Sequence, residues 1–224
     1  MLKKPLYIRI AVVVMILAAD IIWGAGLIYE WKKNEVLIPS TRASSDMFGF
    51  ILQNLLISLI AVSVFVIFLL ALKEDFAGEM YLRVKGKWQR LGTGLGILVL
   101  LVIMAYHLAT REERITTVCL LFYYVFFIAF TEEFVCRDAC TYLLKNEKSL
   151  VRYLVPNLLF AAMHIFNYSG WGSLSGENVL HFIRSDMLIL LGVGCAFQAL
   201  KEKTGTIWIP VLLHAAWDFA LAYK

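Results

Sequence analysis

Apolar runs long enough to cross a lipid bilayer recur along the whole chain of 224 residues. A transmembrane helix needs about 20 predominantly apolar residues, because the hydrocarbon core is about 30 Å thick. The runs therefore predict an all-α fold, a polytopic bundle of seven or eight transmembrane helices. The seven spans that can be delimited cover residues 10–29, 48–72, 91–109, 115–142, 153–168, 186–200 and 206–223. The last three are shorter than a lipid-facing helix needs, so we expect other helices to enclose them in part.

The composition excludes an ordinary soluble protein. Hydrophobic residues make up 61% of the chain and charged residues 17%, against roughly 45–50% and 25% in a soluble domain. We expect a single transmembrane domain over residues 1–224, in which residues 1–109 form unspecific spans and residues 115–223 carry the ionisable motifs. No basic stretch is interleaved with aromatic residues, so nucleic acid is not an expected partner. The four cysteines show no C-x-x-C spacing, which argues against a disulfide framework or a thiolate zinc site.

The distribution of Lys and Arg predicts the topology. These residues are more frequent in the loops on the side of the N-terminus, so the positive-inside rule places the N-terminus in the cytoplasm and the C-terminus outside. The first apolar run continues beyond a possible cleavage point near Ala19, which favours an uncleaved span. Asp20 in this span is expected to face the bundle interior. The compact loops are typical of a bacterial plasma-membrane protein, and residues 169–178, rich in Gly and Ser, are a predicted loop.

Three glycines in the third span, Gly92, Gly94 and Gly96, are spaced by two. We interpret them as positions where another helix packs closely rather than as a phosphate cradle. The chain shows no internal repeat and no nucleotide-binding glycine loop.

Three ionisable side chains lie at the end of the fourth apolar run: Glu132, Glu133 and Arg137. A charge carried into hydrocarbon costs from about 3 to more than 10 kcal/mol, so such groups normally have partners and a function. On a helix, Glu133 and Arg137 are four residues apart and close enough to form an ion pair. That pair alone is compatible with a purely structural role. Glu132 points about 100° away from Glu133 and is left unpaired.

Two further motifs place ionisable groups inside apolar spans: Phe160 with His164, and His214 with Asp218. At about 1.5 Å per residue, His164 lies roughly 16 Å and His214 roughly 12 Å from the inner ends of their spans. Glu132 lies near the inner end of its own span, so all three share one depth. A lone buried histidine is more often a hydrogen-bonded core residue, and Phe160 is expected to pack. The convergence of ionisable groups from three apolar spans indicates a functional site.

Carboxylates and histidines that meet in this way are suited to activating water. Glu132 can deprotonate water with help from His164. Alternatively, His164, His214 and Glu132 can hold a zinc ion that lowers the pKa of its bound water to about 7. His214 and Asp218 can stabilise the oxyanion that forms when a carbonyl is attacked. Such chemistry requires a hydrated cavity enclosed by the helices.

The motifs, in their order along the chain, resemble those of the CPBP family, which includes the type II CAAX prenyl endopeptidases and the bacteriocin-processing, Abi-like intramembrane proteases. The family pattern is E-E-x-x-x-R, then F-x-x-x-H, then H-x-x-x-N/D on successive helices. The resemblance covers about residues 122–218, and residues 203–210 also resemble the stretch that leads into the last motif. It implies that Glu132 activates the water and His164 helps to hold it. It further implies that His214 and Asp218 form the oxyanion or metal site, supported by Glu133 and Arg137.

The chain departs from the family pattern at three positions. Bacterial members commonly have Phe before the Arg and Gly after it, where this chain has Cys136 and Asp138. Asp218 takes the place often held by Asn. Because an ionised Asp repels an oxyanion, we expect Asp218 to be protonated, paired with a histidine, or used in another way.

These observations predict an intramembrane endopeptidase whose site opens to the cytoplasm. The expected substrate is a peptide precursor, a membrane anchor or a CAAX-like tail, with peptide maturation or bacteriocin immunity the favoured role in a bacterium. Two other classes use a similar fold. A non-catalytic scaffold or immunity protein has no need for an unpaired carboxylate in lipid. A proton-coupled transporter uses intramembrane Glu, His and Asp but usually shows inverted repeats.

Overall fold

The fold was analysed in a computed structural model of the chain, which describes residues 5–14, 46–71, 81–165 and 176–222. Within these ranges the regular secondary structure is entirely helical, which confirms the predicted fold class. A short helix over residues 6–14 comes first. The later helices are α2 (Met47–Ala71), α3 (Lys87–Thr110), α4 (Arg114–Phe122), η2 (Tyr123–Ala129), α5 (Phe130–Glu132), η3 (Glu133–Ala139), α6 (Cys140–Leu143), α7 (Ser149–Met163), α9 (Gly176–Arg184), α10 (Asp186–Thr204) and α11 (Trp208–Leu221).

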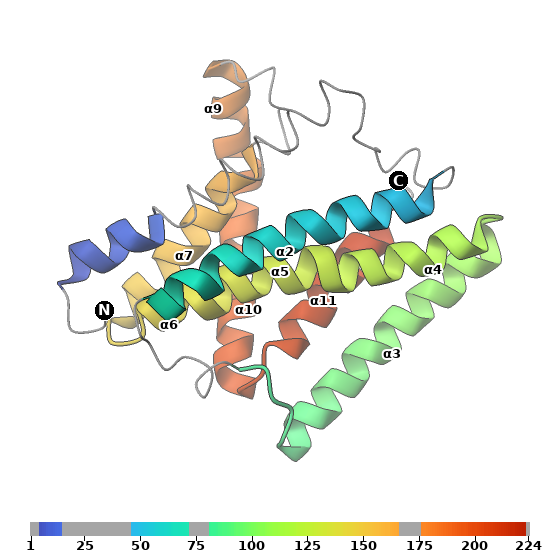
Figure 1. The fold of residues 1–224 in the computed structure, drawn as a ribbon, viewed down its shortest axis with the longest axis horizontal. Coiled ribbons are helices and arrows are strands. Elements are labelled where there is room, and N and C mark those ends of the chain that lie inside the picture. Colours follow the sequence, from blue (N-terminus) through green and yellow to red (C-terminus); the bar gives the residue numbers. More distant parts are fainter. Residues whose placement is uncertain (1–4, 15–45, 72–80, 166–175, 223–224) are drawn as a thin grey trace.

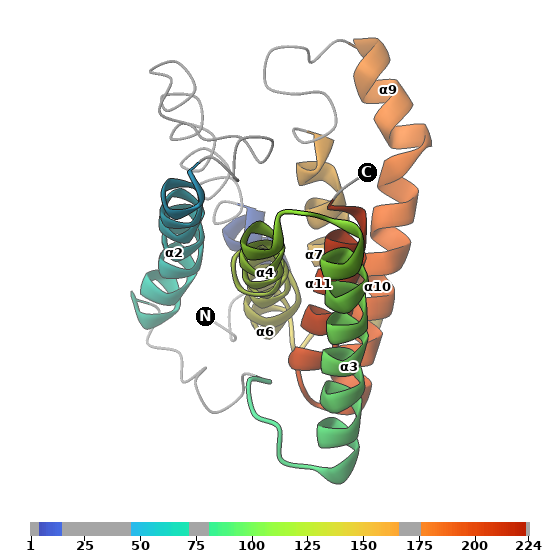
Figure 2. The same ribbon diagram turned by 90° about the vertical axis from the view of Figure 1, so that its right-hand side faces the viewer.

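One long helix lies at the centre of the molecule. The segments from α4 to α6 run on without a break over Arg114–Leu143, as expected for the fourth span. Figure 2 shows this helix nearly end on, with α2 on one side and α3, α10 and α11 on the other. Helix α11 packs on α3 and on η2, and α10 packs on α7. The central helix therefore contacts α2, which precedes it in the sequence, and α11, which follows it.

The central helix contains two π-helical segments, η2 and η3, that the sequence did not predict. In η3 the backbone N–H of Cys140 bonds to the carbonyl of Val135, five residues earlier. Such wide turns are rare and are frequent at functional sites. The Glu133–Arg137 motif lies wholly inside η3, so the wide turn decides how its side chains are directed.

The predicted number of seven or eight spans is not confirmed. In the part of the chain that the structure describes, two helices are long and apolar enough to cross a membrane: α3 and the continuous helix Arg114–Leu143. Helices α9 and α10 form a third if they are taken as one span, bent by 43° at their junction. The surface of α3 is rich in exposed Leu, Ile and Val side chains, as expected of a helix that faces lipid.

The remaining apolar helices are short. Helix α7 has 15 residues and α11 has 14, fewer than the roughly 20 that a lipid-facing span needs. Helix α11 buries seven of its side chains against its neighbours, so the expectation that the last spans are enclosed holds for α11. Figure 1 shows α11 between α3 and α10.

Several boundaries differ from those predicted. Helix α9 begins at Gly176, so the last three residues of the predicted loop 169–178 are helical. Helix α3 begins at Lys87, four residues before the predicted third span. Asp20 and most of the first predicted span lie outside the described residues.

Two of the three glycines in α3 allow α11 to approach closely. A Cβ at Gly96 would lie 2.9 Å from the Cβ of Leu212, and one at Gly92 would lie 2.5 Å from the Cδ1 of Ile209. A Cβ at Gly94 would meet nothing within 4 Å. The close-packing interpretation is therefore confirmed for Gly92 and Gly96 but not for Gly94.

The start of α3 is tied to the turn that precedes α11. The side-chain amide of Gln89 donates to the carbonyls of Thr204 and Gly205, each at 2.9 Å. Gly205 ends α10 with a φ of 69°, a left-handed conformation that glycine adopts at little cost. The indole N–H of Trp208 donates to the carbonyl of Leu82 at 2.9 Å. These bonds fix where α11 begins and so the position of the histidine that it carries.

We expect Gly96→Ala to destabilise the fold and Gly94→Ala to leave it unchanged or slightly more stable. The Cβ of Leu212 lies next to its backbone and cannot move aside, so overpacking costs about 1–3 kcal/mol. At Gly94 the added methyl meets open space and only improves helix propensity, by up to about 1 kcal/mol. Thermal unfolding of both variants in one detergent measures the difference. Equal unfolding temperatures would show that α3 and α11 do not pack closely at Gly96.

Candidate active site

The four side chains predicted to carry the chemistry meet at one place. Glu132 ends α5, His164 caps the end of α7, and His214 and Asp218 lie one turn apart on α11. The Oε2 atom of Glu132 lies 4.0 Å from Nε2 of His164 and 3.7 Å from Nε2 of His214. The shared depth inferred from the sequence thus corresponds to proximity in the fold.

His164 is oriented by its own helix. Its Nδ1 lies 2.9 Å from the carbonyl oxygen of Phe160. A carbonyl oxygen can only accept, so Nδ1 carries the hydrogen. In the neutral ring, Nε2 then presents a lone pair toward Glu132. The ring also meets the face of Phe160 edge on, with centroids 4.5 Å apart.

His214 is oriented by a buried ion pair. Its Nδ1 lies 2.9 Å from Oε1 of Glu133, and the same oxygen lies 3.2 Å from Nη1 of Arg137. The side chains of Glu133 and Arg137 are 0% and 1% exposed. The ion pair predicted from their spacing is confirmed, and it also directs the second nitrogen of His214 toward Glu132.

The guanidinium of Arg137 is held in a close-fitting environment. Its Cζ lies 3.8 Å from the centroid of the Phe160 ring, a cation–π contact. A Cβ at Gly194 of α10 would lie 2.9 Å from Nη2 of Arg137 and 2.5 Å from Oδ1 of Asn157. Phe160 was expected to pack and to support the site. It supports both Arg137 and His164, and so links two motifs.

Asp218 adopts one of the three arrangements considered for it. Its Oδ2 lies 3.5 Å from Nε2 of His214. Nε2 of His214 is therefore flanked by two carboxylates, those of Asp218 and Glu132. The aspartate at this position is therefore paired with a histidine.

These groups line a cavity of about 540 Å³. Glu132, Arg137, His164, His214 and Asp218 form one part of its wall. Much of the remainder is apolar and aromatic and comes from η2, α9, α10 and α11: Tyr123, Tyr124, Ile128, Phe182, Ile189, Leu190, Val193, Phe197 and Trp217. A cavity of this kind can hold a short apolar peptide segment beside the ionisable groups.

The zinc site considered from the sequence does not match the arrangement of the described side chains. Among them, no group of three His, Cys, Asp or Glu residues is placed to hold a metal ion. Both histidines have the second-sphere hydrogen bond that ligating histidines usually show, but the same bond also serves a histidine that holds water. We therefore derive no step through a metal.

Two residues near the guanidinium of Arg137 were not found from the sequence. Gly194 and Asn157 lie in apolar helices and belong to no ionisable motif. Asn157 is fully buried, and its Nδ2 donates to the carbonyl of Tyr153 at 2.8 Å. A polar amide in the middle of an apolar helix was the available signal, since such a group needs a partner.

We expect Gly194→Ala to destabilise the protein by displacing Arg137 and Asn157. The added methyl would come within 3 Å of both side chains, and forced shifts of this kind cost about 1–3 kcal/mol. Gly192→Ala is the matched control, since a Cβ there would meet nothing within 4 Å. Thermal unfolding in detergent compares the two. A Gly194→Ala protein as stable as the control would contradict the close contact with the guanidinium.

Comparison with known proteins bears on the same region. A family model described as type II CAAX prenyl endopeptidase, Rce1-like, matches residues 114–220. The matched segment runs from the start of α4 almost to the end of α11 and contains every residue of the site. Neither the curated proteins nor the solved structures contain a match to the chain. Residues 114–220 therefore match the domain of the Rce1-like type II CAAX prenyl endopeptidases, which supports the membership of the CPBP family that the motifs predict.

Proposed function

We propose that the chain is an intramembrane endopeptidase in which Glu132 activates a water molecule held against His164. One observation carries this proposal. The Oε2 atom of Glu132 is buried and has no hydrogen-bond donor among the described residues, although two imidazole nitrogens lie within 4.0 Å of it. A buried carboxylate oxygen left in this state is costly unless something donates to it.

A water molecule can donate a hydrogen bond both to Glu132 and to His164. The separation of 4.0 Å between Glu132 Oε2 and His164 Nε2 is too long for a direct hydrogen bond. One water can bridge two acceptors at this distance. It donates one hydrogen to the carboxylate and the other to the imidazole, so its lone pairs face the cavity. Water polarised in this way is a nucleophile suited to attack a carbonyl carbon.

The reaction then follows as an ordinary hydrolysis. The water oxygen bonds to the scissile carbonyl carbon while Glu132 takes a proton from the water. The proton passes to the leaving amide nitrogen as the C–N bond breaks. The products are a carboxylic acid and an amine, which exchange a proton to become a carboxylate and an ammonium, and Glu132 is returned to its ionised state.

The oxyanion role falls to His214 rather than to Asp218. Glu132, Glu133 and Asp218 carry three potential negative charges, and Arg137 supplies one positive charge close to them. In an apolar environment such an excess favours extra protons in the site. His214 has a carboxylate near each nitrogen, so it is the group best placed to hold one. Its Nε2–H can donate to the oxyanion while Asp218 keeps the imidazolium charged.

The cavity supports a peptide substrate with apolar side chains near the cleaved bond. Its wall is apolar and aromatic apart from the ionisable groups, and the family consists of membrane proteases. The proposed substrates are a peptide precursor or a membrane-anchored, CAAX-like tail, which reaches a site open to the cytoplasm from the lipid. In a bacterial plasma membrane this activity would serve peptide maturation or bacteriocin immunity.

We expect Glu132→Gln to abolish cleavage while the protein stays folded. The amide has the same shape but cannot accept a proton from water, and loss of a general base costs about 100- to 10,000-fold in rate. The assay uses the purified protein in phosphatidylethanolamine–phosphatidylglycerol vesicles with a library of quenched fluorescent peptides that end in apolar tails. Glu112→Gln, an exposed carboxylate before α4, is the matched control and should cleave like the wild type.

Cleavage retained by Glu132→Gln would contradict the proposed mechanism. A cellular phenotype that is unchanged in this variant would favour the scaffold or immunity protein. Unfolding temperatures of the variant and the control, measured in the same detergent, show that any loss of activity does not come from unfolding.

We expect chelation to leave the activity unchanged. The proposed water is held by Glu132 and His164, and no three donors among the described residues are placed to bind a metal. Metal content of the purified protein and cleavage after treatment with a strong chelator test this expectation. Stoichiometric zinc that is absent from a His164→Ala variant, together with loss of activity on chelation, would establish a zinc enzyme instead.

A further inference from the structure

A second cluster of buried charges lies beside the site, and the proposed reaction does not use it. Asp138 follows Arg137 at a position where bacterial members of the family commonly have glycine. In this chain its Oδ1 lies 3.4 Å from Nζ of Lys201 on α10, and the two side chains are 3% and 2% exposed. Burying an ion pair is expensive, so this pair requires an explanation.

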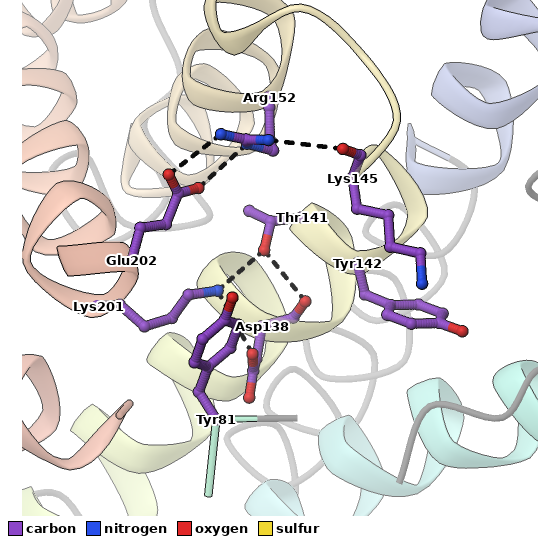
Figure 3. A pocket seen from close by; sticks show the side chains of 8 residues that line it. All are labelled: Tyr81, Asp138, Thr141, Tyr142, Lys145, Arg152, Lys201 and Glu202. Atoms are coloured by element: carbon purple, nitrogen blue, oxygen red, sulfur yellow. Dashed lines mark hydrogen bonds and ion pairs between the residues drawn. The ribbon is translucent and has the colours of Figure 1, made fainter. Parts of the chain in front are cut away.

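Lys201 contacts the backbone of the motif itself. Its Nζ donates a hydrogen bond to the carbonyl oxygen of Arg137 and lies 3.0 Å from Oγ1 of Thr141. The hydroxyl of Thr141 donates to the same carbonyl. Figure 3 shows Lys201 reaching from α10 toward Thr141 and Asp138. Two side-chain donors thus converge on one carbonyl inside the π-helical segment η3.

The conformation of η3 matters for the site because it carries Glu133 and Arg137. Glu133 holds Nδ1 of His214 at 2.9 Å. Helix α10 therefore meets Arg137 at two points. Gly194 lies beside its guanidinium, and Lys201 holds its carbonyl. Lys201 is thus connected to His214 through the backbone of η3 and the side chain of Glu133.

The cluster does not resemble a binding site for an anion. It lines a cavity of about 280 Å³ whose cations have partners. Arg152 contacts both carboxylate oxygens of Glu202 at 3.1 Å, and Lys145 lies over the Tyr142 ring at 4.5 Å. The charge of Lys201 is balanced by Asp138. Because these cations are already paired, we do not assign Lys201 to anion binding. Its contact with η3 is the role that remains.

We propose that Lys201, neutralised by Asp138, is a positioning residue that fixes the carbonyl of Arg137 and thereby the wide turn that directs Glu133 to His214. The proposal rests on the proposed hydrolysis for its effect on rate. It assigns a role to Asp138, where the chain departs from the family pattern: the aspartate allows a lysine ammonium to be buried against this turn.

Two variants distinguish a positioning role of Lys201 from a purely structural ion pair with Asp138. Lys201→Met removes the donor but leaves Asp138 buried and unpaired. Lys201→Met combined with Asp138→Ala removes both charges, which restores the balance of charge but not the donor to the Arg137 carbonyl. Lys203→Met, an exposed lysine of the same helix, is the matched control. Unfolding temperature, kcat and KM are measured for each in vesicles with one cleaved peptide.

We expect the double variant to regain most of the unfolding temperature that the single variant loses, while its kcat stays low and its KM is unchanged. The loss should be about 10- to 100-fold, the size seen when the hydrogen-bond partner of a metal-ligating side chain is removed. A double variant that regains both stability and kcat would overturn the proposal, since the pair would then be only structural. The Lys203→Met control should match the wild type in all three measurements.

A second measurement does not depend on cleavage. Cys136 and Cys140 are buried on η3 and α6, so their labelling by a membrane-permeant maleimide reports opening of the turn. In a Cys119→Ser/Cys195→Ser background, we expect the double variant to be labelled several-fold faster than the Lys203→Met control. Equal labelling rates would refute the role of Lys201 in holding the turn. If the wild type cleaves no peptide, the proposed hydrolysis fails, and labelling alone decides whether Lys201 holds η3.

Discussion

The ion pair between Glu133 and Arg137 is the interaction on which the rest of the site depends. Both side chains are almost completely buried, and removing one partner of such a pair typically costs about 3–5 kcal/mol because the other charge is stranded. The surrounding residues accommodate the buried guanidinium of Arg137: the Phe160 ring covers it, and Gly194 leaves space beside it. The pair in turn holds His214 through Glu133. The partner that the buried Arg137 requires therefore also orients His214, the proposed donor to the oxyanion.

The main features of the site could be predicted because membrane burial makes ionisable residues conspicuous. Glu132, His164 and His214 stand in apolar runs, where each is costly without a function. Counting residues along each span placed them at a similar depth, and the fold brings both histidines within 4.0 Å of Glu132. The i, i+4 spacing of Glu133 and Arg137 was enough to predict their pairing, since this spacing still gave contact inside a π-helical turn.

Other features depend on contacts between distant parts of the chain and left no local signal. Lys201 lies 64 residues from the carbonyl to which it donates, and its place near the end of a helix resembles an ordinary cytoplasmic lysine. Gly194 matters only because Arg137 and Asn157 approach it from two other helices. The π-helical segments contain no Pro or Gly from which a departure from α-helical geometry could be predicted. The predicted number of spans is not confirmed in the described residues, because hydropathy measures apolar length and not whether lipid or protein surrounds a helix.

Glu132 and Glu133 are adjacent in sequence but lie in different environments, because an α-helical segment meets a π-helical segment between them. Glu132 is the last residue of α5, and Glu133 is the first residue of η3. The side chain of Glu132 is 28% exposed and reaches the cavity, whereas that of Glu133 is fully buried against Arg137. Chemically identical carboxylates are thus separated into an unpaired one that faces the cavity and a paired one that supports the geometry. The wide turn maintains this separation, so under the proposed function contacts that stabilise η3 from α10 would affect the hydrolysis without touching the substrate.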